Sequence, residues 1–288
     1  MRAGAIWLSL AACLATGHAA AEPCGLVPEV SRIVTGVTAG DALLLDDGSE
    51  VVLIGALPPV NLTEMKAPDT PWPPAETTRL ALSALVNGKA VGLAFSGRRL
   101  DRYGRQLAHA FVGTGAEQFW VQGRLIETGL ARAYGLPGSQ TCVDELVSLE
   151  QTARLAHLGH WATGIFADRA ADEPRTLSAF RDSFQTVEGR VERLDRVRGH
   201  RLLQLGAERT DFAVELITKR GRSLSGWNPE DLAGRRIRVH GWLEGSRRPR
   251  ITLDDMRMIE VLEDMTPAPS PEPQAQTSQA QPIPAADR

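Results

Sequence analysis

Aromatic residues and cysteines are scarce in this 288-residue chain, at 5% aromatics and three cysteines. A disulfide-dense miniprotein is therefore excluded. No apolar run approaches the roughly 18 residues that a membrane-spanning helix needs. The chain also lacks an excess of one charge, since 32 Lys and Arg face 35 Asp and Glu. The net charge of −3 gives no overall argument for a nucleic-acid partner. An apolar fraction of 43% excludes collagen-like and wholly disordered chains, and the length indicates two domains.

The N-terminus has the pattern of a secretory signal peptide over residues 1–21. Arg2 precedes a short apolar run at 5–15, and three alanines at 19–21 form a small-residue cleavage site. This predicts an exported protein, either periplasmic or secreted. The stretch that ends at Cys13 resembles a bacterial lipobox, so a lipoprotein anchored through Cys13 is the alternative.

Removal of the signal peptide leaves two cysteines, Cys24 and Cys142. In an oxidising compartment an even pair of cysteines is a candidate disulfide. Two unpaired thiols remain the alternative, because sequence does not show whether the Cα atoms come within bonding range.

Composition divides the rest of the chain into two domains and a tail. Charged residues and Pro174 interrupt the apolar pattern before residue 184, which predicts a linker over 167–183 between domains at 25–166 and 184–262. Residues 25–183 carry 14 basic and 18 acidic residues, whereas residues 184–262 carry 16 and 12. The second domain is thus basic. The Pro- and Gln-rich residues 265–288 predict a disordered tail.

The first domain has five short strand patterns with helical patterns inserted among them, which predicts a small β-barrel of the OB type with three helices. Expected strands are 30–37, 42–45, 50–54, 91–95 and 106–112, and expected helices are 74–87, 118–128 and 143–158.

The second domain is nearly all strand and predicts another OB-like five-stranded barrel, with a small sandwich as the alternative. The expected strands are 187–194, 201–205, 212–217, 237–243 and 251–261. Its arginines cluster, but stacking aromatics are sparse: Phe212 follows the core alternation, while Trp242 lies out of phase with it.

Two runs in the first domain carry a family resemblance. They are Asp101-Arg102-Tyr103-Gly104-Arg105-Gln106-Leu107-Ala108 and Leu125-Ile126-Glu127-Thr128-Gly129-Leu130-Ala131, with Glu150, Ala153-Arg154 and Gly159-His160-Trp161 downstream. Over about residues 28–166 the chain resembles the thermonuclease, or staphylococcal-nuclease-like, family. The resemblance implies a phosphodiesterase that cleaves DNA and RNA with Ca²⁺.

The resemblance also implies where the catalytic groups belong. Asp41 matches a metal-binding aspartate, and Arg105 matches a phosphate-binding arginine. The stretch Val51 to Val60 aligns without a gap, yet it places Val52 at the second arginine, Leu57 at a metal-binding aspartate and Val60 at the carboxylate that serves the attacking water. Three of five catalytic positions are therefore apolar.

Apolar side chains cannot bind phosphate or Ca²⁺. Asp41 alone would hold Ca²⁺ weakly, and a rearranged site would need Glu64 or the carboxylates of Asp46, Asp47 and Glu50. Asp101 is expected either to staple the Asp-Arg-Tyr-Gly-Arg turn with Arg105 or to contribute to ligand binding. Tyr134 is a candidate for stacking on a base, against half-buried packing.

These observations predict a catalytically degenerate thermonuclease-like protein that binds nucleic acid or another phosphate-bearing ligand. Two alternatives remain open. One is an active Ca²⁺-dependent nuclease with a rearranged site, and the other is a periplasmic protein-interaction module.

Overall fold

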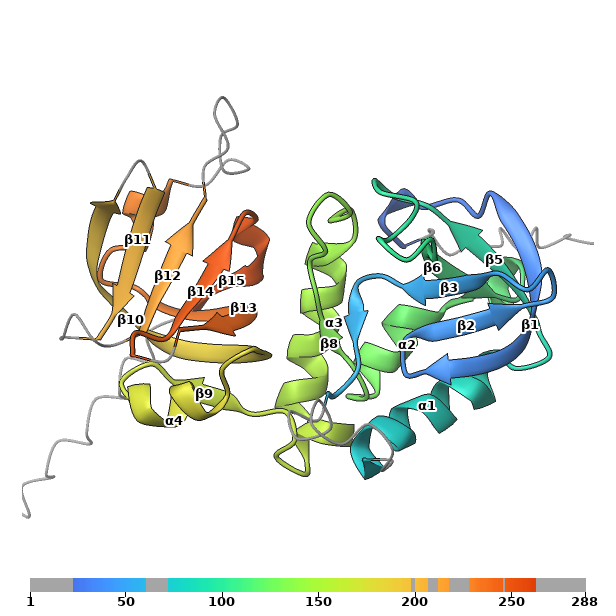
Figure 1. Cartoon of the computed structure of the whole chain (residues 1–288), viewed down its shortest axis with the longest axis horizontal. Helices are drawn as coiled ribbons and strands as arrows, with labels where there is room; N and C mark the ends of the chain where they lie inside the picture. Colours follow the sequence, from blue (N-terminus) through green and yellow to red (C-terminus); the bar gives the residue numbers. More distant parts are fainter. Residues whose placement is uncertain are drawn as a thin grey trace, which may run out of the picture.

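The computed structural model describes residues 23–60, 72–197, 200–206, 212–217, 228–245 and 247–262. Two β-barrels lie side by side, and helix α3 (Val143–Leu155) stands between them (Figure 1). The predicted signal peptide, Cys13, Glu64 and the predicted tail lie outside the described residues. Within these ranges no helix has the length and apolar character needed to cross a membrane.

The first barrel closes in the order β1-β2-β3-β6-β5-β1, with only the β3–β6 pair parallel. Its strands are β1 (Val30–Ala39), β2 (Ala42–Leu45), β3 (Glu50–Leu53), β5 (Ala90–Ala94) and β6 (Gln106–Val112). Alternate residues of these strands, such as Val51 and Leu53, are buried in the barrel core. The predicted OB-type barrel with three helices is confirmed.

The three helices of this domain are α1 (Pro73–Val86), α2 (Val121–Glu127) and α3. Helix α1 begins with two prolines, which suit a first turn whose N–H groups have no helical partner. Helix α2 begins three residues later than predicted, because Phe119 and Trp120 form strand β7 and pair with β6. Its predicted end holds, since Gly129 follows with φ +72°. A short pair, β4 (Ala56–Leu57) and β8 (Arg132–Ala133), leads from the barrel toward α3.

The second barrel closes in the same order of strands as the first, β10-β11-β12-β14-β13-β10, with β12 and β14 parallel. Its strands are β10 (Ser183–Val197), β11 (His200–Leu205), β12 (Phe212–Leu216), β13 (Arg236–Glu244) and β14 (Arg250–Leu253). Phe212 is fully buried and Trp242 is 42% exposed, as their positions in the alternation indicated. Because β10 also pairs with β13, the sheet closes, and the predicted barrel is confirmed over the alternative sandwich.

Two segments differ from expectation. The segment 167–183 was expected to be a linker, but it contains β9 (Asp168–Ala170), which pairs in parallel with β10, and α4 (Pro174–Ala179), whose Leu177 is buried. The last expected strand is two strands, β14 and β15 (Ile259–Leu262), separated by the 3-10 turn η5 (Met256–Met258). Asp255 starts this turn by accepting the backbone N–H of Arg257. The remaining 3-10 turns are η1 (Pro23–Gly25), η2 (Gly115–Glu117), η3 (Gly159–Trp161) and η4 (Pro229–Leu232).

The barrels share a packed contact around α3. Val143 of α3 belongs to the hydrophobic cluster of the second barrel, and Leu57, Tyr134 and Val147 pack against that cluster from the first domain. Arg132 is buried at the same place, where it donates to the carbonyl of Phe184 and lies over the Phe184 ring at 5.2 Å. The second barrel therefore covers part of the first.

Candidate functional site

The Asp-Arg-Tyr-Gly-Arg run forms a tight turn in the loop 97–105, between β5 and β6. Asp101 holds this turn: one of its carboxylate oxygens accepts the backbone N–H groups of Tyr103 at 2.8 Å and Arg105 at 2.9 Å. The other oxygen accepts Arg105 Nε at 2.7 Å. Gly104 supplies φ +81°, which a side chain would oppose. Desolvation opposes ionisation of Asp101, but these hydrogen bonds hold its pKa below the usual value. Asp101 therefore staples the turn.

Arg105, at the start of β6, is close enough to Asp41 and Glu50 to interact with both electrostatically. Asp41 lies in the turn between β1 and β2, and burial raises its pKa to about 6 despite the favourable charge of Arg105. A carboxylate so placed carries a proton over part of the near-neutral pH range. Asp41 and Arg105, the two retained catalytic positions of the resemblance, are therefore brought together by the fold.

The three substituted positions do not complete the site. Val52 pairs with Ala42 across β2 and β3, and Leu57 packs against the cluster of the second barrel. Val60 is 52% exposed. Ca²⁺ requires several oxygen ligands, and of the five positions given by the resemblance only Asp41 supplies a carboxylate. Over the described ranges, no group of three His, Cys, Asp or Glu could hold a metal ion. The described residues at these positions do not fit a Ca²⁺ centre.

Two of the nearby carboxylates that were considered as replacements, Asp47 and Glu50, have hydrogen-bond partners. Asp47 accepts hydrogen bonds from Ser49 and from Arg32 Nε at 3.1 Å, and Glu50 accepts one from Thr38 at 2.8 Å. These contacts turn both side chains toward neighbours on the barrel surface.

Tyr134 lies at the contact between the barrels. Its ring meets that of Phe184 edge-on, with centroids 5.5 Å apart. Burial raises the pKa of its hydroxyl, which a side-chain hydrogen bond from Trp242 partly offsets. The tyrosine is half-buried and stacks against protein, so the packing role is the one the geometry supports.

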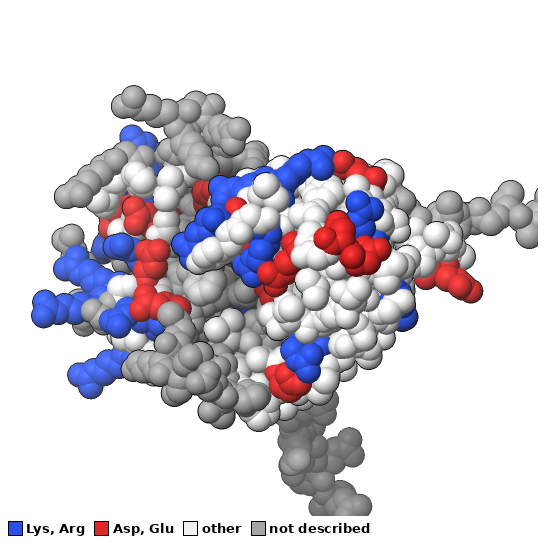
Figure 2. All heavy atoms as spheres, turned by 45° about the vertical axis from the view of Figure 1, so that its right-hand side comes forward, with Lys and Arg blue, Asp and Glu red and all other residues white. Residues whose placement is uncertain are grey.

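Other exposed side chains of the loop 97–105 were not among the predicted site residues. Arg98, Arg99 and Arg102 are exposed, and Tyr103 is 68% exposed. The guanidinium of Arg102 lies 4.8 Å from the centre of the Tyr103 ring. Four arginines within eight residues, around one tyrosine, were the available signal. Figure 2 brings the side of the first barrel forward; basic side chains gather across the upper middle and at the left of the view, with acidic side chains beside them.

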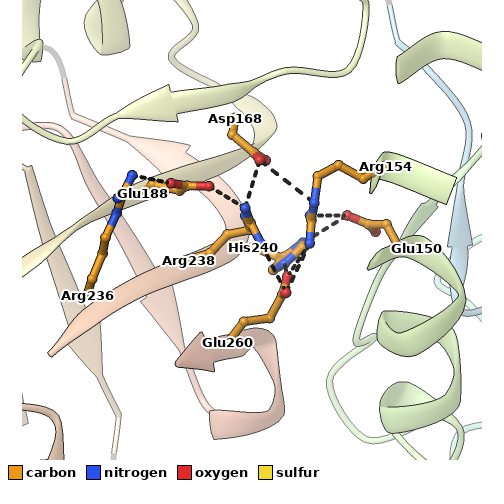
Figure 3. A network of polar contacts seen from close by, with 8 residues as sticks. All are labelled: Glu150, Arg154, Asp168, Glu188, Arg236, Arg238, His240 and Glu260. Atoms are coloured by element: carbon orange, nitrogen blue, oxygen red, sulfur yellow. Dashed lines mark hydrogen bonds and ion pairs between the residues drawn. The ribbon is translucent and has the colours of Figure 1, made fainter. Parts of the chain in front are cut away.

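Family-motif residues on α3 take part in a buried ionic network with the second barrel (Figure 3). Arg154 contacts Glu260 at 2.9 Å and Glu150 at 3.5 Å. His240 is fully buried, with Nε2 at 2.6 Å from Glu260 and Nδ1 at 3.3 Å from Glu150. The other members of the network are Asp168, Glu188, Arg236 and Arg238. The network fixes the two barrels to each other.

Cys24 and Cys142 are joined by a disulfide, with Cα atoms 5.5 Å apart. The bond ties η1 to the start of α3, and Cys142 is 1% exposed.

Comparison with known families agrees with this geometry. Residues 60–163 match the family model described as staphylococcal nuclease homologue. The matched region begins three residues after β4 and includes η3, and strands before it complete the barrel. A search of curated proteins finds no match to the chain. The first barrel and its three helices form a staphylococcal-nuclease-like domain.

Proposed function

We propose that the protein is an exported, non-catalytic binding protein for single-stranded nucleic acid. Loss of hydrolysis follows from the substituted positions, since Val52 cannot donate to a phosphate and Leu57 cannot bind a cation. Removal of one charge-stabilising donor typically lowers an enzymatic rate 10²- to 10³-fold. An arginine and two carboxylates are missing together here. The raised pKa of Asp41 adds to this, because a protonated carboxyl is a poor cation ligand.

Binding is assigned to the loop 97–105, and one observation carries it: Tyr103 is exposed and has arginines on both sides. Single-stranded nucleic acid is held by basic side chains along the backbone and by aromatic faces on which bases stack. The staple formed by Asp101 fixes the loop before any ligand arrives, which reduces the entropy lost on binding.

Export is proposed from the signal-peptide pattern of residues 1–21. The Cys24–Cys142 disulfide is consistent with an oxidising compartment. N-terminal sequencing of the exported protein would check the cleavage site and the Cys13 alternative.

Fluorescence anisotropy with a labelled oligodeoxythymidine tests the binding. We expect affinity to fall with salt, because bound cations are released from the strand. Tyr103→Ala should weaken binding about tenfold, in line with the loss of one stacked base. Arg102→Gln should lower the salt slope by about 0.7 for a lost phosphate contact on a single strand. The control is Arg124→Gln, which removes an exposed arginine of α2 and should leave affinity unchanged.

Cleavage is measured on the same oligonucleotide with and without Ca²⁺, and we expect intact substrate in both. Ca²⁺-dependent cleavage that Arg105→Ala abolishes would establish the active nuclease with a rearranged site. Neither cleavage nor salt-dependent binding would point to the protein-interaction module instead.

A further inference from the structure

The outer face of the second barrel contains a cavity of about 540 Å³ that the function proposed above does not use. Its floor is formed by β11 and β12, the second and third strands of the barrel, and one wall by the loop before β14. OB barrels commonly bind ligands on the face of these strands. The volume is in the range of small-molecule sites.

Strand register explains the hollow. Gln204 of β11 lies opposite Ala213 of β12, which in turn is the partner of Arg250 of β14. Neighbouring strands are about 4.8 Å apart, so the three residues form a row across the sheet. In this row only the methyl group of Ala213 lies between the Gln204 amide and the Arg250 guanidinium. The small side chain of Ala213 leaves the depression between them.

The Gln204 side chain lacks a hydrogen-bond partner for one of its atoms. The residue is 6% exposed and lines the cavity, and within the described part of the chain no donor reaches its Oε1 atom. A buried acceptor without a partner costs about 1–3 kcal/mol. A ligand with an N–H or O–H group in the cavity would remove this cost.

The opposite wall is cationic. Arg248 is exposed and, within the described ranges, makes no ion pair, while Arg250 is 3.4 Å from Glu244 and 3.9 Å from Glu215. The acidic residues of the lining have partners too, since Asp195 contacts Arg193 at 2.9 Å and Glu215 contacts His200 at 3.4 Å. An anionic group is therefore favoured beside Arg248.

The rest of the lining includes apolar side chains, Val197, Leu202, Ala213 and Pro249. A flat, uncharged ring can lie on such a surface. The required ligand thus has a hydrogen-bond donor at one end, a ring in the middle and an anion at the other end.

We propose that this cavity binds a nucleotide, with the base edge on Gln204 and the phosphate on Arg248 and Arg250. A glutamine amide pairs well with a base edge, and arginine pairs well with phosphate. The nucleotide is either free or one unit of a strand. This site is separate from the loop 97–105 and does not rest on the function proposed for it.

Calorimetric titration of the full chain with each of the four nucleoside 5′-monophosphates tests the site. We expect at least one to bind, and tighter than inorganic phosphate by tenfold or more. Ala213→Leu fills the hollow and should abolish binding, whereas Ala213→Ser keeps it. Gln204→Leu and Arg248→Gln should each weaken binding about tenfold, which corresponds to one lost contact. The control for Arg248 is Arg175→Gln, an exposed arginine on α4, with no change expected.

The source of the nucleotide is resolved with a short oligodeoxythymidine on Tyr103→Ala protein, where binding at the loop is reduced. Residual binding that Ala213→Leu removes indicates a nucleotide unit of a strand; binding of monophosphates alone indicates a free nucleotide. Two results together would overturn the proposal. The wild-type protein would bind no monophosphate at millimolar concentration, and Ala213→Leu would remove no strand binding from the Tyr103→Ala protein. The proposal would also be overturned if inorganic phosphate bound as tightly as the monophosphates. Selective binding of an oligouronate, an anion without base or phosphate, would overturn it too. None of these outcomes depends on whether the loop binds nucleic acid.

Discussion

Asp101 is held by contacts that do not depend on catalysis. Its two oxygens accept three hydrogen bonds within five residues, and its side chain is 17% exposed. These contacts serve the turn whether or not the domain cleaves a substrate. Retention of the Asp-Arg-Tyr-Gly-Arg run therefore does not by itself indicate nuclease activity.

Replacement of Asp101 by alanine should destabilise the domain by about 1–2 kcal/mol, because two backbone N–H groups and the Arg105 guanidinium lose their acceptor. It should also weaken oligonucleotide binding, since the loop loses its fixed shape. Urea unfolding followed by tryptophan fluorescence measures the first effect. The control is Glu127→Ala, which breaks an exposed pair with Arg124 and should cost less than about 0.5 kcal/mol. Equal losses for the two variants would contradict the staple.

At the scale of elements, both barrels could be predicted because alternation and turn residues are local signals. The start of β10 could not, since Ser183 to Thr186 lacks the alternation that marks a half-buried strand. These residues are buried on both faces, and they contact Arg132 of the first domain at Phe184 and strand β9 at Thr186. The break between β14 and β15 had a signal in Asp254-Asp255, which favours a cap over a continuous strand.

Part of the candidate site could also be predicted, because the motifs that carry it are local in the sequence. Alignment placed Asp41 and Arg105 in the site, and the barrel does bring them together. The setting of Leu57 and Tyr134 depends on a second domain that contacts them from far along the chain. Sequence patterns carry no information on such docking.

The disulfide constrains two elements, η1 and α3, and we expect it to have a large effect on stability. It closes a loop of 118 residues, for which the chain-entropy model gives about 5 kcal/mol of stabilisation. We expect Cys142→Ser to lower the urea midpoint markedly. Dithiothreitol should lower it for the wild-type protein and leave the Cys142→Ser variant unchanged. A midpoint of wild-type protein that is insensitive to reductant would argue against the bond.

At the scale of the molecule, the two barrels are held together by charges that lie out of water. Arg154 from α3 meets Glu260 from β15, and Arg238 bridges Glu260 and Asp168. Four acidic groups of this network face three arginines and His240, and the buried Arg132 also lies close enough to Glu150 and Asp168 to interact with both. Breaking a buried pair leaves an uncompensated charge and is strongly destabilising. The docking of the barrels therefore depends in part on the charge of His240.

Protonated His240 should make the docked structure dependent on pH. Burial lowers the pKa of His240, but Glu150 and Glu260 outweigh it and raise the pKa to about 9. In the unfolded chain the pKa is close to 6.5, so its contribution is complete below pH 6.5 and is lost as pH rises through 9. The pKa of Glu260 is lowered to about 2, since His240 and the arginines outweigh desolvation, and its contribution is lost only as pH falls below about 4.5. Burial raises the pKa of Asp168. Its contribution to stability therefore falls as pH rises through the acid range, opposite in direction to that of Glu260.

The contribution of His240 to stability should therefore fall by an amount on the order of 3 kcal/mol between pH 6.5 and 9. Urea unfolding at intervals between pH 5 and 9 measures this. His240→Asn should be less stable at pH 6 and should lose most of the decline, because no group then gives up a proton inside the network. The matched control is His157→Asn, at an exposed position with φ +50°, and it should keep the wild-type profile. If His240→Asn retains the same decline between pH 6.5 and 9, the charge that couples the barrels does not lie on His240.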